Sequence, residues 1–473
     1  MSSNAFVKYR ILCVLPLFLM ATLFLLVVSV NTSPLSSAEG GDSSIYKLLG
    51  LGILHGRMPY VDLFDNKGTY LYLINALGQW LIPGRSGIFV LQVVSLTVAL
   101  TFLYATLRLF VKPGKAMLCV ALSLFLLAGC YQGGNHVEEW MLPYLSVGLY
   151  LAIDLFMTPQ RLSEGKTVAK RSLVFGLCFG VVLMLRPNDA VAFFGGIMVG
   201  MVLWLLRQKD FRIAVFGTLS FLGGAIIAVA PIVIWYASQS ALSDLWFGMF
   251  LCNSKMAKGL GGQFLSLLKW GKWAILLLML TLCLMVLNTE HKKLLWIIVP
   301  TGVFHLMLIG EKMYAHYFIP LFPLLVLYVL MLFLQRNKTV LILAIAILCL
   351  SHRPLPRMAV LNLFDSAKAL GVRPIVDRQP IPEEEKNSVW NYSVDPWRPG
   401  SPLAWLVNHD VVQCNRKTDR LDKLVKEVDF KDVNPIWVVS YGNEFESDSL
   451  SVGYALVDSV AAEGYSVWFY RRQ

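Results

Sequence analysis

The sequence predicts an all-α, polytopic membrane domain followed by a small α/β domain. Two observations carry this prediction: long apolar runs recur through residues 1–351, and charged residues make up only 15% of the chain. A soluble domain usually carries about 25% charged residues, and about 20 consecutive apolar residues span a bilayer. We therefore predict a membrane domain over residues 1–351 and an extracytoplasmic domain over residues 352–473.

About eleven membrane-spanning helices are predicted from these apolar runs. The first run follows Lys8 and Arg10 and is longer than the hydrophobic region of a signal peptide, so we expect it to be retained as a helix. Two runs, 173–186 and 339–351, are short and need extension or a locally thin bilayer. The predicted spans are 11–31, 86–111, 115–132, 140–157, 173–186, 190–206, 213–237, 270–288, 294–310, 319–335 and 339–351.

Basic residues in the connecting loops predict the orientation, because short cytoplasmic loops are enriched in Lys and Arg. With the amino terminus in the cytoplasm, the alternation of spans places all of the basic clusters on that side. This topology also explains the net charge of +11 better than nucleic-acid binding does. The clusters are Lys8/Arg10, Lys112/Lys115, Arg161/Lys166/Lys170/Arg171, Arg207/Lys209/Arg212, Lys292/Lys293 and Arg336/Lys338.

The same alternation places the polar motifs on the outer, extracytoplasmic side of the membrane. They lie in residues 42–67, 135–139, 186–189, 239–268 and 311–316. Residues 43–55 and 68–82 are amphipathic, and we expect both to form helices that lie along the outer surface. The eight cysteines have neither the spacing of a metal cluster nor that of a disulfide framework.

Beyond residue 352 the composition changes to a proline-rich segment and then to short patterned stretches. Residues 420–428 have a helical pattern, and residues 436–439 and 465–470 are strand-like. These patterns predict a small α/β domain. Gly259–Gly262 lacks the strand and helix that a nucleotide-binding glycine motif needs.

Three carboxylates, those of Asp42, Asp62 and Asp65, cluster after the first span. Asp42 has two interpretations: it caps the helix that begins at Ser43, or it is a general base just outside the bilayer. Asp62 and Asp65 lie next to Asn66-Lys67-Gly68, a sequence typical of a turn. They are either solvated turn residues or binding residues.

Asn135 and Glu138 have the spacing of a capping box at the start of a helix. Adjacent helical residues point about 100° apart, so we do not expect Glu138 and Glu139 to face one site together. One of them can cap the helix while the other projects inward.

Several cations on the outer side are candidates for phosphate binding. Arg186 either extends from its helix end to the interface or binds a phosphate with two hydrogen bonds. Lys312 and His316 have the same two interpretations, and Lys255 lies in a loop that is either a connector or a phosphate-facing lid. Together these cations around acidic residues suit a lipid-phosphate leaving group and a hydroxyl nucleophile.

The segment from Asp42 to Tyr46, followed by Gly56 to Gly68, resembles the first outer loop of bacterial GT-C superfamily glycosyltransferases. These enzymes include protein mannosyltransferases and lipid A aminoarabinose transferases. Residues 133–139 and 316–320 are similar to later motifs of the same group, and the resemblance covers residues 1–350.

The resemblance implies an inverting hexosyl- or pentosyltransferase that uses a polyprenyl-phosphate sugar donor and a glycan, lipid or protein acceptor. It implies Asp42 as the catalytic base and Glu138 or Glu139 as the second acidic position. Lys67, Arg186 and His316 are then candidates for stabilising the departing phosphate. The chain has Lys67-Gly68-Thr69 where the family usually has Lys-Gly-Pro, and Asp42 has no acidic neighbour, so a divalent metal (Mg²⁺ or Mn²⁺) stays open.

Two rival functions remain. A lipid or solute transporter predicts charged residues within the spans and related halves, whereas the polar residues here gather at one surface. A non-catalytic scaffold would recruit partners through residues 352–473.

Overall fold

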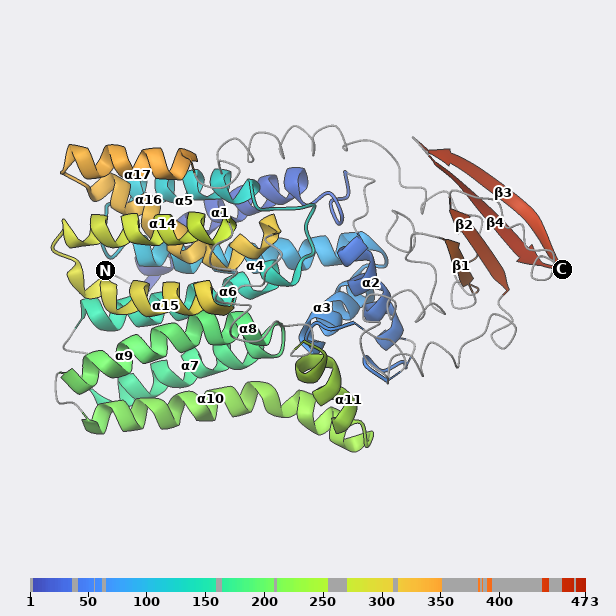
Figure 1. Cartoon of the computed structure of the whole chain (residues 1–473), viewed down its shortest axis with the longest axis horizontal. Helices are drawn as coiled ribbons and strands as arrows, with labels where there is room; N and C mark the ends of the chain where they lie inside the picture. The colour runs from blue at the N-terminus through green and yellow to red at the C-terminus, as the bar shows by residue number, and fades with distance from the viewer. Residues whose placement is uncertain are drawn as a thin grey trace.

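The computed structural model describes residues 3–35, 41–54, 56–61, 65–158, 164–207, 211–253, 270–308, 314–350, 382, 385, 389–393, 436–441, 453–462 and 465–473. Within them, long helices form a bundle and a four-stranded sheet lies beyond one end of it (Figure 1).

The helices of the bundle follow the apolar runs of the sequence. They are α1 (Ser3–Val28), α2 (Gly41–Leu54), α3 (Thr69–Leu81), α4 (Arg85–Leu107), α5 (Pro113–Ala128), α6 (Val137–Met157), α7 (Gly165–Leu183), α8 (Pro187–Ala190), the π-helical turn η2 (Val191–Gly195), α9 (Gly196–Arg207), α10 (Phe211–Ser238), α11 (Leu242–Trp246), the π-helical turn η3 (Phe247–Leu251), α14 (Trp270–Leu287), η4 (Lys292–Leu294), α15 (Leu295–Leu308), η5 (Ala315–Leu321), α16 (Phe322–Leu334) and α17 (Lys338–Leu350).

Each predicted span coincides with one of these helical segments. Among the described residues, five helical stretches are long and apolar enough to cross a membrane: Arg85–Leu107, Val137–Met157, Pro187–Arg207, Phe211–Ser238 and Ala315–Leu334. The short run at 173–186 belongs to a helix that begins earlier, at Gly165. The count of about eleven spans stays a prediction, because α1, α5, α14 and α17 contribute shorter apolar stretches.

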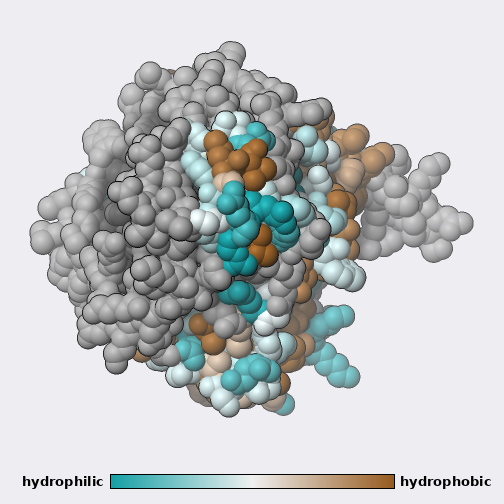
Figure 2. Space-filling model, turned by 90° about the vertical axis from the view of Figure 1, so that its right-hand side faces the viewer, coloured by the Kyte–Doolittle hydropathy of each residue, from teal (hydrophilic) through white to brown (hydrophobic). Residues whose placement is uncertain are grey.

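The surface and the packing of the bundle both suit a membrane. Leu219 and Ile226 of α10 are 60% and 66% exposed. Hydrophobic residues cover the described flank behind the sheet end, whereas hydrophilic residues gather at that end (Figure 2). Between α7 and α10, a Cβ at Gly176 would lie 1.9 Å from the carbonyl oxygen of Phe221. Small residues of this kind let helices approach closely in a lipid environment.

Helices α2 and α3 occupy the two predicted amphipathic segments and pack against each other. A Cβ at Gly50 would lie only 2.6 Å from the backbone nitrogen of Ala76. Both helices lie toward the end of the bundle that faces the sheet (Figure 1). That they lie along a membrane surface stays a prediction.

The sheet has the strand order β1-β2-β4-β3. Strand β1 (Val389–Ser393) pairs in parallel with β2 (Trp437–Tyr441), and β4 (Tyr465–Arg472) pairs antiparallel with β2 and with β3 (Tyr454–Ala462). Strands β2 and β4 match the strand-like stretches of the sequence, whereas β1 and β3 were not predicted. The predicted helix at 420–428 lies outside the described residues, and the domain boundary at residue 352 stays a prediction.

Candidate functional site

A left-handed turn before α6 shapes the site. Gly133, Gly134 and Asn135 have φ angles of 84°, 82° and 60°. Asn31 holds the turn, because its backbone N–H and its side-chain amide donate to the carbonyl oxygens of Gly133 and Gly134 at 2.8 and 2.9 Å. A Cβ at Gly134 would lie 2.0 Å from the hydroxyl oxygen of Ser29. The glycines are therefore required both by conformation and by space.

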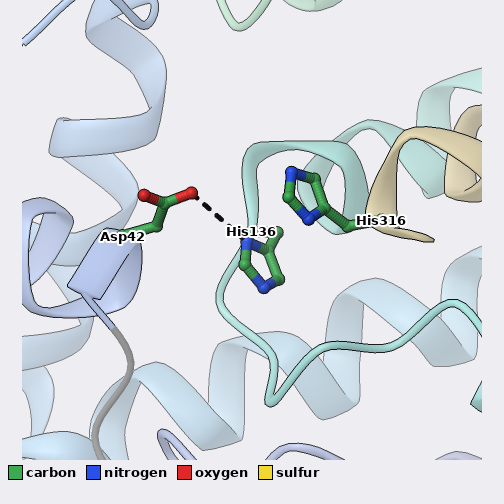
Figure 3. Close-up of side chains that lie close together, drawn as sticks. All are labelled: Asp42, His136 and His316. Atoms are coloured by element: carbon green, nitrogen blue, oxygen red, sulfur yellow. Dashed lines mark ion pairs between the residues drawn. The ribbon is translucent and has the colours of Figure 1, made fainter. Parts of the chain in front are cut away.

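The turn delivers His136 to a cluster with Asp42 and His316 (Figure 3). The Asp42 carboxylate lies 3.8 Å from Nδ1 of His136, and 47% of the Asp42 side chain is exposed. The two imidazole rings stack at 4.4 Å with an angle of 6° between their planes. Helix α2 begins at Gly41, so Asp42 lies within its first turn rather than at the cap position that the sequence suggested.

Gln132 fixes both imidazole rings. Its carbonyl oxygen lies 2.8 Å from Nε2 of His136, and its side-chain oxygen lies 2.6 Å from Nδ1 of His316. Since a carbonyl oxygen only accepts hydrogen bonds, these two ring nitrogens carry the hydrogens. In the neutral rings the lone pairs are then on Nδ1 of His136 and Nε2 of His316, and Nδ1 of His136 is buried without a hydrogen-bond partner.

A divalent cation fits this cluster by its donor chemistry. The ligand atoms of Asp42, His136 and His316 all lie within 4.8 Å of one another. Metal-binding histidines usually have their other ring nitrogen fixed by a hydrogen bond, and Gln132 supplies that bond to both rings.

Glu139 caps helix α6. Its carboxylate accepts hydrogen bonds from the backbone N–H of His136 at 3.0 Å, from Gln92 at 2.8 Å and from the Tyr131 hydroxyl. Burial, followed by the Glu139 charge, raises the pKa of Tyr131 well above its ordinary value, so the phenol stays protonated and donates. The predicted pairing of Asn135 with Glu138 is thus wrong by one residue, because the left-handed Asn135 lies before the cap at His136.

Glu138 projects into the site, as expected for a neighbour that points about 100° away. It is 1% exposed and forms an ion pair with Arg186. The other side of the guanidinium lies 3.1 Å from Asp189, and its plane lies 4.4 Å from the ring centre of Tyr317. Nε2 of His316 is 4.0 Å from Glu138, which links this ion-pair network to the Asp42 cluster.

Hydrogen bonds to its backbone hold Lys67 in place, and the described contacts of its ammonium group include no carboxylate. The hydroxyls of Tyr60 and Tyr72 donate to its carbonyl oxygen, and its ammonium donates to Asn66 at 2.8 Å. Burial raises the pKa of Tyr60 well above its ordinary value and keeps that hydroxyl protonated. The next residue packs tightly, because a Cβ at Gly68 would lie 1.9 Å from the Met184 carbonyl oxygen.

Asp65 is buried, and its Oδ2 lies 3.1 Å from the Tyr72 hydroxyl, as an alternative acceptor to the Lys67 carbonyl oxygen. The buried Tyr46 lies in the same region, and burial, followed by the charge of Asp42, raises its pKa well above the ordinary value. The predicted residues Asp62, Lys255 and Lys312 lie outside the described residues.

The structure thus brings together Asp42, Glu138, Arg186 and His316 from four separate stretches of sequence. Sequence reasoning missed His136, Gln132 and Asp189 as site residues. Asp189 follows Arg186 by three residues, the spacing of neighbours on one helix face, and His136 lies within the same polar motif as Glu138. The sequence positions of Asp189 and His136 could therefore have identified them as site residues, whereas nothing in the local sequence identifies Gln132.

A small, half-open apolar pocket lies near this cluster, between α5, α14 and α16. Its wall includes Cys130, two residues before Gln132, and Phe318, two residues after His316. It extends inward as far as Tyr328.

The comparisons with known proteins concern the fold. The sequence matches no family model and no curated protein. ArnT from Cupriavidus metallidurans bound to undecaprenyl phosphate is similar over 99% of this chain and 98% of its own, with a TM-score of 0.58 and 13% identity. The same enzyme in the apo state has a TM-score of 0.55 and 13% identity over 99% and 98% of the two chains.

A looser likeness is to the apo oligosaccharyltransferase of Archaeoglobus fulgidus, at 12% identity, 90% and 69% coverage and a TM-score of 0.48. The ArnT likeness extends over nearly the full length of both chains, including the part beyond residue 352. The chain therefore has the same fold as this ArnT, an integral-membrane fold of the kind that the resemblance of its first loop implied.

Proposed function

We propose that the protein transfers a hexose or pentose from a polyprenyl-phosphate donor to a hydroxyl of a cell-envelope acceptor, with inversion. The observation that carries this proposal is the half-exposed Asp42 carboxylate beside a buried Arg186 network. A base that faces solvent and cations held nearby suit a hydroxyl nucleophile and a phosphate leaving group.

Asp42 is the proposed base. One of its oxygens points toward His136 and the other points away (Figure 3), which leaves the second oxygen to accept a proton. In the proposed step the acceptor oxygen bonds to the anomeric carbon while the bond from that carbon to the phosphate oxygen breaks. The electron pair leaves with the phosphate, and the acceptor proton passes to Asp42.

Arg186 and Lys67 are the proposed partners of the departing phosphate, whereas His316, whose Nδ1 is held by Gln132, is assigned to the metal site proposed below. Glu138 and Asp189 hold the guanidinium from two sides, so its position is fixed before the reaction, as electrostatic stabilisation requires. In this proposal Glu138 acts by positioning Arg186, and Glu139 acts by fixing the start of α6. Asp62, Asp65, Lys255 and Lys312 stay candidates for donor or acceptor binding.

The lipid part of the donor has a suitable neighbour in the apolar pocket between α5, α14 and α16. An isoprenoid chain would bury apolar surface there at about 25 cal/mol per Å². The proposed topology places the amino terminus in the cytoplasm and the sheet outside, so that donor and acceptor meet on the outer face of the bacterial cytoplasmic membrane.

Two imidazoles and one carboxylate favour Zn²⁺ over Mg²⁺, since Mg²⁺ prefers oxygen ligands. We infer that Asp42, His136 and His316 hold such an ion in place of the Mg²⁺ or Mn²⁺ considered from the sequence. When bound, the ion supplies positive charge beside the leaving phosphate.

Metal analysis of the purified protein tests this inference. We expect about one equivalent of Zn²⁺ in the wild type and its loss in His136→Ala and His316→Ala, because a site with three protein ligands needs each of them. His291→Ala, at the other end of α15, serves as the control and should retain the metal. An unchanged metal content in both site variants would contradict the assignment.

The substrate class is tested by incubating the purified protein with a panel of polyprenyl-phosphate sugars and measuring the release of polyprenyl phosphate. Release with at least one sugar, together with a glycosylated acceptor, supports the transferase. The transporter alternative predicts movement of lipid or solute in reconstituted vesicles without cleavage of any donor. Deletion of residues 352–473 tests the scaffold alternative. If the shortened protein still cleaves the donor but no longer forms complexes, the scaffold function is limited to this segment.

A further inference from the structure

A second cluster of polar side chains lies behind Arg186, where α8 meets α15. Thr301 and His305 of α15 are 0% and 1% exposed, and Asp189 of α8 is mostly buried. In the described part of the chain, five buried side-chain atoms lack a hydrogen-bond partner, and three of them are here: Asp189 Oδ2, Thr301 Oγ1 and His305 Nε2. Unsatisfied buried polar atoms are rare, so such a concentration needs an explanation.

Helices α9 and α15 pack closely against each other around this cluster. A Cβ at Gly196 would lie 2.5 Å from Cα of Thr301, and one at Gly200 would lie 1.6 Å from the Trp296 carbonyl oxygen. The ring of His305 stands edge-on to Phe193, at 6.2 Å. Phe193 belongs to the π-helical turn η2, a local irregularity that is frequent at functional sites.

The hydrogen-bond chemistry of the cluster calls for a donor. Nδ1 of His305 lies 2.9 Å from the Thr301 carbonyl oxygen and therefore carries the hydrogen. In the neutral ring Nε2 is then an acceptor, and Asp189 lies four residues, about one helical turn, before Phe193, whose ring contacts His305. Asp189 Oδ2 is an acceptor too, and the single Thr301 hydroxyl can donate to only one of the two. A water molecule, with two donors and two acceptors, satisfies such a group.

Asp189 connects this cluster with the site. Its Oδ2 lies 3.1 Å from Nε of Arg186, in an ion contact without the geometry of a hydrogen bond. The guanidinium also pairs with Glu138 and lies over Tyr317. The orientation of Asp189 therefore decides where the remaining N–H groups of Arg186 point.

We propose that Asp189, Thr301 and His305 bind one buried water molecule and thereby position Arg186, with His305 as a positioning residue for the transfer. The positioning role rests on the function proposed above, whereas the water site does not. His305 touches neither the donor nor the acceptor in this account. Its effect reaches the donor phosphate through the water, Asp189 and Arg186 in turn.

The test compares His305→Phe, His305→Gln and the control His291→Phe in the full chain. The Phe variant keeps an aromatic ring against Phe193 but removes both ring nitrogens. We expect its KM for the polyprenyl-phosphate donor to rise on the order of tenfold, with a smaller change in kcat. His305→Gln restores a polar atom near the position of Nε2 and should recover most of the loss.

A double variant tests the route through Asp189. If His305 acts by way of this carboxylate, His305→Phe combined with Asp189→Asn should weaken donor binding no more than Asp189→Asn alone. Additive losses, or an unchanged KM in His305→Phe, would overturn the positioning role.

A spectroscopic readout keeps the water site testable even if no donor is ever found. In ¹⁵N-histidine spectra, assigned by loss of one signal in His305→Phe, the His305 ring should be neutral with the hydrogen on Nδ1. Nε2 should show the shift of a hydrogen-bonded acceptor, and Thr301→Val should move it. A proton on Nε2, or an Nε2 shift typical of a nitrogen without a hydrogen bond, would overturn the water site. Failure of the proposed function would instead appear as a wild type that neither binds nor cleaves any donor.

Discussion

Arg186 balances the buried negative charge of the site. Its guanidinium pairs with Glu138 and contacts Asp189, and the side chains of these three residues are 18%, 2% and 13% exposed. Removing one partner of a buried ion pair leaves the other charge uncompensated, which costs about 3–5 kcal/mol. The structural role of Arg186 and its proposed catalytic role thus fall on one side chain, and a pair of variants can separate the two.

Arg186→Gln should lower the free energy of unfolding by about 3–5 kcal/mol and abolish transfer. The double variant Arg186→Gln with Glu138→Gln should regain much of the stability, because the glutamine no longer buries a charge, but none of the activity. Denaturant unfolding in detergent and the transfer rate measure the two effects. Equal stability of the single and the double variant would contradict the ion-pair assignment.

The residue types of the site were predictable, but their partners were not. Asp42, Glu138, Arg186 and His316 are titratable residues on the expected outer side, and the resemblance to a known family singled out Asp42 and the pair Glu138/Glu139 among the acidic residues. That Glu139 rather than Glu138 caps α6 depends on the left-handed Asn135, which moves the cap by one residue. The roles of Gln132 and His136 arise from contacts across up to 184 positions of sequence, and no local pattern records these.

At the scale of elements, the turn before α6 is the part on which the site depends most. Gly134 has a φ of 82°, and a Cβ there would lie 2.0 Å from the Ser29 hydroxyl oxygen. Any side chain at this position moves the turn that carries His136.

Gly134→Ala should therefore destabilise the protein by about 1–3 kcal/mol and lower kcat/KM at least tenfold, since small displacements of catalytic groups are costly. Gly114→Ala in α5 is the matched control, because a Cβ at Gly114 meets nothing within 4 Å. We expect the control to be neutral or slightly stabilising. Wild-type stability and activity in Gly134→Ala would refute the role of the turn.

The sheet contains an ion pair that makes its stability depend on pH. Arg471 and Trp437 donate hydrogen bonds to Glu385 at 2.6 Å each, and these bonds lower the pKa of Glu385 below its ordinary 4.5. A carboxylate with a lowered pKa in the folded state stabilises that state above its unfolded pKa, and this stability is lost as the pH falls through the folded pKa.

Glu385→Gln should therefore make the sheet less stable at neutral pH and remove part of the loss that the wild type shows below pH 4.5. Hydrogen exchange of the backbone amides of β2 and β4 in the full chain, compared between the variants from pH 7 to pH 3, measures this. The exposed Glu290 provides the control Glu290→Gln. Parallel pH curves for the wild type and Glu385→Gln would exclude the contribution of this pair.

At the scale of the whole molecule, hydropathy predicted the helices well, because apolar runs in lipid form helices that satisfy their own backbone hydrogen bonds. The sheet was less predictable. The strand-like residues 436–439 and 465–470 gave β2 and β4, but β1 and β3 include Asn391, Asp458 and other polar residues that hide the pattern. Helix α7 begins at Gly165, earlier than the predicted span 173–186. Hydropathy missed this first part of the helix because it contains the charged residues Lys166, Lys170 and Arg171.

The whole account depends on Asp42 as the residue that accepts the acceptor proton. The most direct measurement is the rate of polyprenyl phosphate release by the wild type and by Asp42→Asn, in one reconstituted system with donor and acceptor present. Asparagine keeps the shape of the side chain but cannot take the proton, and general base catalysis contributes about 10²–10⁴-fold. The remote Asp458→Asn, whose carboxylate contacts only the backbone of Ser459 among the described contacts, controls for loss of charge. We predict a fall of at least 10²-fold in Asp42→Asn with unchanged folding and membrane insertion, whereas a folded Asp42→Asn protein that releases polyprenyl phosphate at the wild-type rate would contradict the account.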